Sequence, residues 1–112
     1  MIARLWRAFA ARERANDYVE HFQRSVFPEL IHIDGYRGAY VMQRDLNDGV
    51  ELLVVTLWES MDAIRKFAGE NAEAAVVAPA AQALLRAYDS TVTHYEIALD
   101  VAQTSCPMPL TF

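Results

Sequence analysis

Histidines are the residues of this sequence best suited to moving a proton, because a free imidazole titrates near neutral pH, at about 6.5. The 112-residue chain has three, at positions 21, 32 and 94. His94 lies between Val92 and Glu96 in an alternating stretch that is typical of a strand. We therefore predict His94 as the candidate general base. The alternative is a hydrogen-bonded histidine at an interface between two subunits.

The spacing of possible metal ligands argues against a metal site. The histidines are far apart in the sequence, there is a single cysteine, Cys106, and neither H-E-x-x-H nor C-x-x-C occurs. The four glycines, at positions 35, 38, 49 and 69, form no phosphate-binding loop, so a nucleotide or flavin fingerprint is also absent. We expect neither a metal nor a cofactor.

Aromatic side chains are the second group that suggests chemistry. Trp58 ends an apolar run and would either present its N–H to a ligand or fill the corner between a strand and a helix. Other aromatic residues would line a pocket for a planar ligand or simply form core. Arg4 and Arg37 would meet a ligand carboxylate, form salt bridges or point to solvent. The predicted substrate-binding residues are Trp58, Phe67, Tyr36 and Tyr40, and Trp6 belongs to the same possible pocket.

The stretch 50–69 is expected to organise the elements that hold these groups. Residues 50–58 are apolar on both faces between Leu52 and Val55, which predicts a central strand. Ser60 is a good N-cap for a helix over residues 61–68, and Gly69 is a good residue to end it. This stretch therefore predicts a buried strand followed by a helix that covers the sheet.

The rest of the chain predicts three more strands and further helical segments. Asp48 and Gly49 predict a hairpin turn, and Gly38 predicts a bulge or a close backbone approach. One face of the second strand is expected to carry Tyr36, Gly38, Tyr40 and Met42. The predicted strands are 2–7, 36–44, 50–58 and 89–99, and the predicted helices are 10–27 (with one turn after Pro28), 61–68, 72–77 and 79–86.

This order of elements predicts an α+β fold. Two βαβ-like halves with right-handed crossovers give the ferredoxin-like βαββαβ arrangement, with a four-stranded antiparallel sheet and helices on one face. The uncovered face would carry many apolar residues, so we expect two copies to pack sheet against sheet as a homodimer, an α+β barrel. Residues 1–99 form the predicted domain, and residues 100–112 a C-terminal tail.

Composition narrows the classes of partner. Hydrophobic residues make up 54% of the chain and charged residues 22%, which indicates a globular protein. The net charge of −5 and the scattered arginines argue against nucleic-acid binding. No apolar run is long enough to span a membrane, and the arginines near the N-terminus argue against a signal peptide. We expect a cytoplasmic protein.

Three segments carry a resemblance to a known family. Residues 57–69, L-W-E-S-M-D-A-I-R-K-F-A-G, resemble the signature in which an apolar strand ends in Trp and a Ser-initiated helix follows. Residues 35–40, G-Y-R-G-A-Y, are similar to the entry of the second strand, with Asp34 in place of the usual Pro, and residues 92–97 are similar to the common ending. The family is the antibiotic biosynthesis monooxygenases, and the resemblance implies the dimeric α+β barrel.

The resemblance does not carry over the two best understood chemistries of that family. In the haem-degrading branch, Phe67 and Val77 match the positions of a helix Trp and of the iron-ligating His, and Val cannot ligate iron. In the cofactor-free quinone-forming branch, Val54 and Ile64 match an Asn and a Tyr, and only Trp58 is retained. The site of neither branch is expected in this chain.

Two functions remain as hypotheses. The first is a small cofactor-independent monooxygenase or oxidoreductase that acts on an aromatic or quinol-type molecule, whose own anion reduces dioxygen while the protein deprotonates and shields it. The alternative is a non-catalytic homodimer that binds a small ligand or serves as a stress-associated protein. A cavity with a titratable group converging on it would favour the first, and a sealed core would favour the second.

Overall fold

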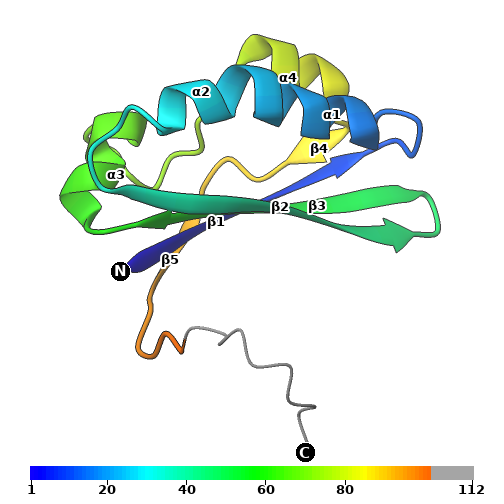
Figure 1. Ribbon diagram of the computed structural model, residues 1–112. Helices are drawn as coiled ribbons and strands as arrows, with labels where there is room; N and C mark the ends of the chain where they lie inside the picture. Colours follow the sequence, from blue (N-terminus) through cyan, green and yellow to red (C-terminus); the bar gives the residue numbers. More distant parts are fainter. Residues whose placement is uncertain (102–112) are drawn as a thin grey trace, which may run out of the picture.

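The computed structural model describes residues 1–101 of the chain, and most of the predicted tail, with Cys106, lies outside them (Figure 1). The strands form one antiparallel sheet in the order β2-β3-β1-β4, and β5 pairs with the same edge of β1 as β4. The elements are β1 (Ile2–Ala10), α1 (Ala15–His21), the π-helix η1 (Phe22–Val26), α2 (Phe27–Leu30), β2 (Tyr36–Leu46), β3 (Gly49–Trp58), α3 (Met61–Ala68), α4 (Pro79–Leu84), β4 (Ala87–Tyr88) and β5 (Thr93–Glu96).

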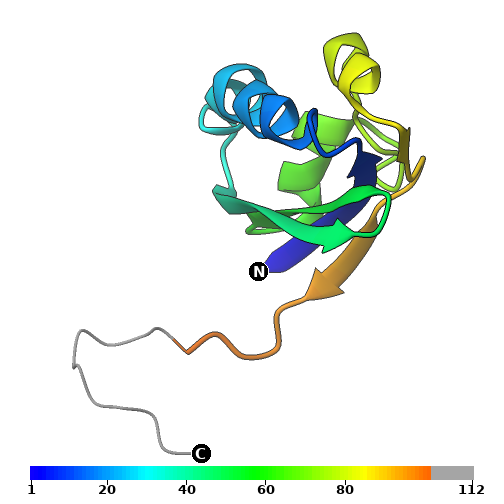
Figure 2. The ribbon, with the colours of Figure 1, turned by 90° about the vertical axis from the view of Figure 1, so that its right-hand side faces the viewer.

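All the helices lie on one face of this sheet, as Figures 1 and 2 show from two directions. The helices α1 and α2 run together along one side, and α4 lies on the other side of the same face (Figure 2). This confirms the predicted ferredoxin-like α+β arrangement, with five strands in the sheet instead of four. The dimeric barrel stays a prediction.

The central strand and its covering helix are where the sequence predicts them. β3 pairs with β1 on one side and β2 on the other, and its residues alternate between fully and partly buried. Ser60 Oγ accepts a hydrogen bond from the Ala63 backbone N–H (3.2 Å), which satisfies one of the free donors at the start of α3. The backbone of Gly69 turns the chain out of α3 at a φ of 84°, a conformation that favours glycine.

A bulge changes the faces of β2. The register opposite β3 shifts between Tyr36 and Gly38, which confirms the predicted bulge at Gly38. Because one extra residue is inserted there, the side chains beyond it change face. Tyr36 lies on the helix-covered face against Trp58, whereas Tyr40 pairs with Val55 on the open face and is 61% exposed. The prediction that Tyr36 and Tyr40 share a face is therefore wrong.

The first helix starts later than the sequence predicts. β1 continues to Ala10, paired with Val50, so the helix begins only at Ala15. The chain stays helical beyond Pro28 to Leu30, as predicted, but residues 22–26 form a wider π-turn. A proline ring clashes with the carbonyl four residues earlier, and in the π-turn the Phe27 N–H donates instead to the Phe22 carbonyl five residues back.

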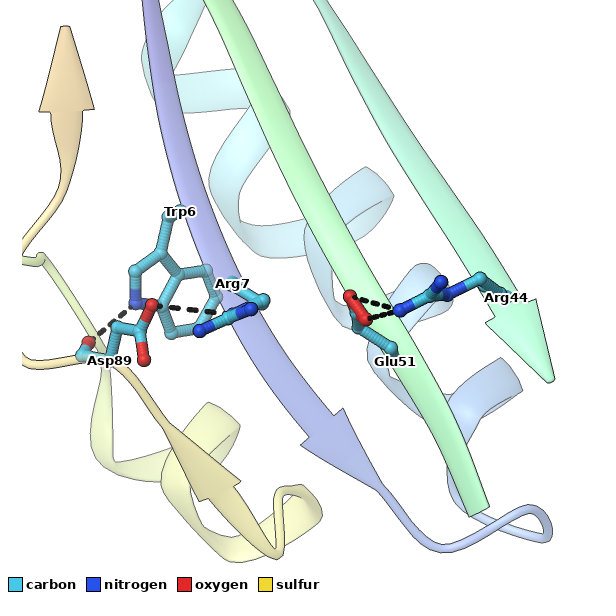
Figure 3. Close-up of polar contacts among 5 residues, drawn as sticks. All are labelled: Trp6, Arg7, Arg44, Glu51 and Asp89. Atoms are coloured by element: carbon cyan, nitrogen blue, oxygen red, sulfur yellow. Dashed lines mark hydrogen bonds and ion pairs between the residues drawn. The ribbon is translucent and has the colours of Figure 1, made fainter. Parts of the chain in front are cut away.

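The last predicted strand is divided in two, and the predicted helix over residues 72–77 is absent. Between β4 and β5 the chain leaves β1 and pairs with residues 73–75, through an Ala74–Thr91 bridge and a hydrogen bond from the Val92 N–H to the Glu73 carbonyl (2.8 Å). The Trp6 indole N–H donates to the Asp89 carbonyl (2.8 Å) and holds the connection against β1 (Figure 3). Residues 72–77 thus pair with the connection instead of forming a helix.

Candidate functional site

A small cavity of about 50 Å³ lies between the sheet and the helical layer. Its floor comes from the inward residues of β1 and β3, one wall from α1 and η1, and the opposite wall from α3, α4 and the irregular segment 76–78. Most of the side chains are apolar or aromatic, and the charged or titratable ones are few. The lining residues are Arg4, Trp6, Tyr18, His21, Phe22, Val26, Leu30, Val54, Thr56, Phe67, Val76, Val77, Ala78, Ala81 and Val92.

Arg4 is the cation of this cavity. Arg4 is only 4% exposed, and the central carbon of its guanidinium lies 5.8 Å from the centre of the Phe67 ring. It donates hydrogen bonds to the backbone carbonyls of Ala72 and Ala74. Burial lowers the pKa of Arg4 to about 10, so the group remains protonated at neutral pH. No carboxylate forms an ion pair with Arg4 within residues 1–101.

His94 lies beside Arg4 on the neighbouring strand, and it does not line the cavity. The two residues are directly opposite in the β1–β5 register, and Arg4 Nη1 lies 3.1 Å from His94 Nε2. Because a guanidinium can only donate, His94 Nε2 accepts this bond and its proton is on Nδ1. Burial lowers the pKa of His94, the charge of Arg4 lowers it further, and Glu73 opposes them. The geometry therefore makes His94 a neutral partner of Arg4.

His21, unlike His94, lines the cavity. It ends α1, immediately before the π-turn, and its ring centre lies 6.0 Å from that of Tyr18. Its Nε2 atom is buried and has no hydrogen-bond partner among the residues that the structure describes. An unpaired buried polar atom costs free energy of folding, commonly about 1–3 kcal/mol. Because His21 lines the cavity, this atom is a candidate hydrogen-bond acceptor for a molecule that widens the cavity.

The predicted substrate-binding residues are distributed over three places. Phe67 lines the cavity, whereas Trp58 is fully buried behind it, with its ring 5.8 Å from that of Phe67 and its N–H donated to Thr56 Oγ1 (2.8 Å). Tyr36 packs edge-on against Trp58 and does not line the cavity, and Tyr40 is on the open face of the sheet. Of the four, only Phe67 contacts the cavity.

The cavity includes positions where the family resemblance expects reactive groups. Val54, Phe67 and Val77 all line it, while Ile64 is a fully buried core residue. These positions are apolar here, and the lining side chains that carry polar atoms are Arg4, Trp6, Tyr18, His21 and Thr56.

From the sequence, Arg4 is only one of two cations that could meet a ligand carboxylate, and His21 has no predicted role. A signal for Arg4 was available, because the two-residue period puts it on the same face as Trp6. No comparable signal existed for His21, because its burial depends on the π-turn and on the segment packed across from it.

Residues 1–101 contain no cluster of three or more His, Cys, Asp or Glu side chains that could hold a metal ion. None of the helices described for these residues is long and apolar enough to cross a membrane.

Comparisons with known proteins agree with this architecture. A family model described as "Antibiotic biosynthesis monooxygenase" matches residues 1–79. Fourteen chains of solved structures are similar to this chain. Among them is a Bacillus cereus protein described as a candidate antibiotic biosynthesis monooxygenase, with a TM-score of 0.66 and 16% identity, over 94% of this chain and 98% of that one. At that identity the likeness shows the fold. No protein of the curated collection matches the sequence.

Proposed function

Because the chain belongs to the antibiotic biosynthesis monooxygenase family, we propose that it is a cofactor-independent monooxygenase that oxidises a small aromatic or quinol-type molecule in the cavity beside Arg4. The observation that carries this proposal is a buried cation, at the floor of an aromatic-lined cavity, that has no counter-ion among residues 1–101. A buried charge is costly unless it is paired. An ionised phenol or enol would supply the missing anion, and Trp6, Tyr18 and Phe67 would hold its ring.

The role of Arg4 is to favour the anion of the substrate. A guanidinium has five N–H groups, and three of them are used by Ala72, Ala74 and His94. The other two are available to an ionised hydroxyl. Hydrogen bonds to charged groups contribute about 1.5–3 kcal/mol each, so the pKa of a hydroxyl bound there falls. His94, by accepting one guanidinium N–H, fixes the orientation of Arg4.

The anion is the reductant in the proposed reaction. It transfers one electron to dioxygen, and the resulting superoxide and substrate radical combine into a peroxide. The peroxide loses water to leave a new carbonyl, so a phenol with a free ring C–H becomes a quinone. One dioxygen is consumed for each substrate: one oxygen atom enters the product and the other leaves as water. The apolar walls keep bulk water away from the radical pair.

The cavity must widen to admit such a molecule. Its volume of about 50 Å³ is far below the roughly 300 Å³ of a small ligand pocket. The segment 75–78 has no regular secondary structure, and its residues 76–78 line the cavity. Val76 in it is 50% exposed. We expect this segment to move outward when substrate enters.

A homodimer formed through the open sheet face completes the proposed assembly. That face carries apolar residues that no helix covers, and Figure 1 shows the sheet bare on that side. Tyr40, Met42 and Tyr95 on it are 61%, 46% and 58% exposed. A second copy packed sheet to sheet would bury them, since exposed apolar patches of this kind mark contact surfaces.

Dioxygen uptake tests the proposed reaction. A panel of phenols, naphthols and quinols should include substrates that the protein oxidises faster than they autoxidise, with one dioxygen consumed and one isotope-labelled oxygen atom incorporated per product. No uptake above autoxidation across the panel, combined with tight binding of the same molecules, would instead favour the alternative, a non-catalytic ligand-binding dimer. The small volume of the cavity favours the non-catalytic alternative.

A further inference from the structure

We propose that His21 is the general base of this site, the group that takes the proton from the substrate hydroxyl before the oxidation begins. This inference rests on the proposed function, and it goes beyond it by assigning the proton to a named atom, Nε2 of His21. Three features of the structure support it: a buried nitrogen without a partner among the described residues, a π-turn that begins at the next residue, and the opposite arrangement at His94.

The first feature is the state of the Nε2 atom. It is buried, it has no partner among residues 1–101, and His21 lines the same cavity as Arg4. In the tautomer with its proton on Nδ1, the Nε2 lone pair is a vacant hydrogen-bond acceptor. A hydroxyl that entered the cavity would supply the donor that this atom lacks.

The second feature is the backbone at His21. The residue joins α1 to the π-turn η1, and two residues of that turn, Phe22 and Val26, line the cavity. Single π-turns inside helices occur frequently at functional sites. Here the π-turn widens the helix from the residue after His21 onward. The backbone on this side of the cavity is therefore irregular, whereas α3 on the opposite side is a regular α-helix.

The third feature is the contrast with His94. The lone pair of His94 Nε2 is already used by the Arg4 guanidinium (3.1 Å), and His94 is not part of the cavity lining. His94 therefore acts through Arg4, as a positioning residue. Of these two histidines, His21 is the one that lines the cavity with Arg4 and whose Nε2 atom has no partner among residues 1–101.

The proton step is balanced within the site. The O–H bond of the substrate breaks, its electron pair stays on oxygen, and the proton forms a new N–H bond at His21 Nε2. The phenolate then lies beside the Arg4 guanidinium, and the proton that left the oxygen gives His21 its positive charge. No electron moves until dioxygen reacts, so this step can be observed without oxygen.

A chromogenic phenol gives a direct readout, because the phenolate of 4-nitrophenol absorbs visible light and the neutral phenol does not. Binding is measured by quenching of tryptophan fluorescence, anaerobically, at a mildly acidic pH at which the free probe is mostly protonated. The variants are His21→Gln, which keeps a polar side chain that cannot take the proton, Arg4→Met, and the control His32→Gln, because His32 is exposed. We expect wild type and His32→Gln to bind the probe as phenolate.

In His21→Gln we expect the probe to bind within about threefold of the wild-type affinity but as the neutral phenol. Retention of the phenolate band in His21→Gln would overturn the role of His21 as the base. Loss of binding in Arg4→Met would, independently, support the binding of the anion by Arg4. If wild type binds no probe, or if Arg4→Met binds it as well as wild type, the proposed function fails together with this inference.

Discussion

At the scale of single residues, the cavity is lined by the buried cation Arg4 and by the half-buried His21, whose Nε2 atom is itself buried. Arg4 is held by two backbone carbonyls and by His94, so its position is fixed before any ligand arrives. Such preorganisation matters because groups that need not reorient stabilise a developing charge most effectively. Trp58, the residue that first attracts attention in the sequence, acts one layer behind, through Phe67 and Thr56.

The lowered pKa of His94 predicts a pH-dependent stability. Burial and the charge of Arg4 hold the pKa below its ordinary value of 6.5, and Glu73 offsets this in part. The unfolded chain therefore takes up the proton first, so protonation favours unfolding. The contribution of His94 to stability is complete above about pH 6.5 and is lost as the pH falls through the lowered value. Urea denaturation of wild type at neutral and mildly acidic pH should show this loss.

The variant His94→Gln isolates this effect from the titration of the carboxylates. Its side-chain oxygen still accepts a hydrogen bond from Arg4, but it has no imidazole to protonate. Its free energy of unfolding should fall less than that of wild type between neutral pH and about pH 5. Identical pH dependence of the two proteins would contradict a lowered pKa at His94.

The sequence gives the residue-scale picture only in part. Phe67 was correctly expected near a pocket, because it belongs to the apolar stripe of a helix that covers the sheet. Tyr40 was expected beside Tyr36, and one inserted residue at Gly38 moved it to the other face. A glycine within a strand can indicate a bulge. The face on which the residues after the bulge lie depends on their register with the partner strand.

At the scale of elements, the contact between α3 and the turn before β2 fixes the helix on the sheet. Gly35 has a φ of 96°, and a Cβ there would lie 2.6 Å from the Cβ of Ala63 in α3. The Glu59 N–H also donates to the Gly35 carbonyl (2.8 Å). The turn and the start of α3 therefore touch backbone to backbone, and only glycine fits between them.

Gly35→Ala should thus destabilise the protein more than Gly69→Ala. Both residues have positive φ values, a strain of about 1–3 kcal/mol for alanine, but a Cβ at Gly69 would meet no atom within 4 Å. Overpacking against Ala63 adds a further cost of roughly 1–3 kcal/mol in Gly35→Ala alone. Urea denaturation of the two variants measures the difference, and equal losses of stability would contradict the close contact with α3.

Elements with strong local signals were predictable, and those that depend on distant partners were not. The helix Met61–Ala68 has a cap, an apolar stripe and a terminal glycine, and it forms where predicted. Residues 72–77 are rich in alanine and favour a helix locally, but Arg4 binds the carbonyls of Ala72 and Ala74, and residues 90–92 pair with the same segment. These tertiary hydrogen bonds outweigh intrinsic propensity, which is a weak prior.

At the scale of the whole molecule, the two faces of the sheet have different tasks. The covered face holds the core and the cavity, and the open face is the proposed contact with a second copy. Glu51 pairs with Arg44 at one end of the open face and Arg7 with Asp89 at the outer strand, whereas the middle is apolar (Figure 3). Charged pairs around an apolar centre are the usual anatomy of a protein interface.

A charge in the middle of the open face should break the proposed dimer. Leu53, opposite Met42 in β2, is partly buried there, so Leu53→Asp would place a carboxylate against the partner. Sedimentation at micromolar concentration should give a dimer for wild type and a monomer for Leu53→Asp. The control Gln23→Asp, on the exposed surface of η1, should remain dimeric. A monomeric wild type would contradict the sheet-to-sheet assembly.

Dioxygen uptake by Arg4 variants tests whether the buried arginine activates a substrate for reaction with dioxygen, as we propose. With the best phenol or quinol of the panel, Arg4→Met should lose about 10- to 100-fold in turnover, the effect of losing a hydrogen bond to a charged group. Arg4→Lys, which keeps the charge, should retain part of the activity, and the exposed control Arg24→Met should equal wild type. Circular dichroism would verify that each variant is folded. Full dioxygen uptake by a folded Arg4→Met protein, or no uptake by wild type, would contradict this role of Arg4.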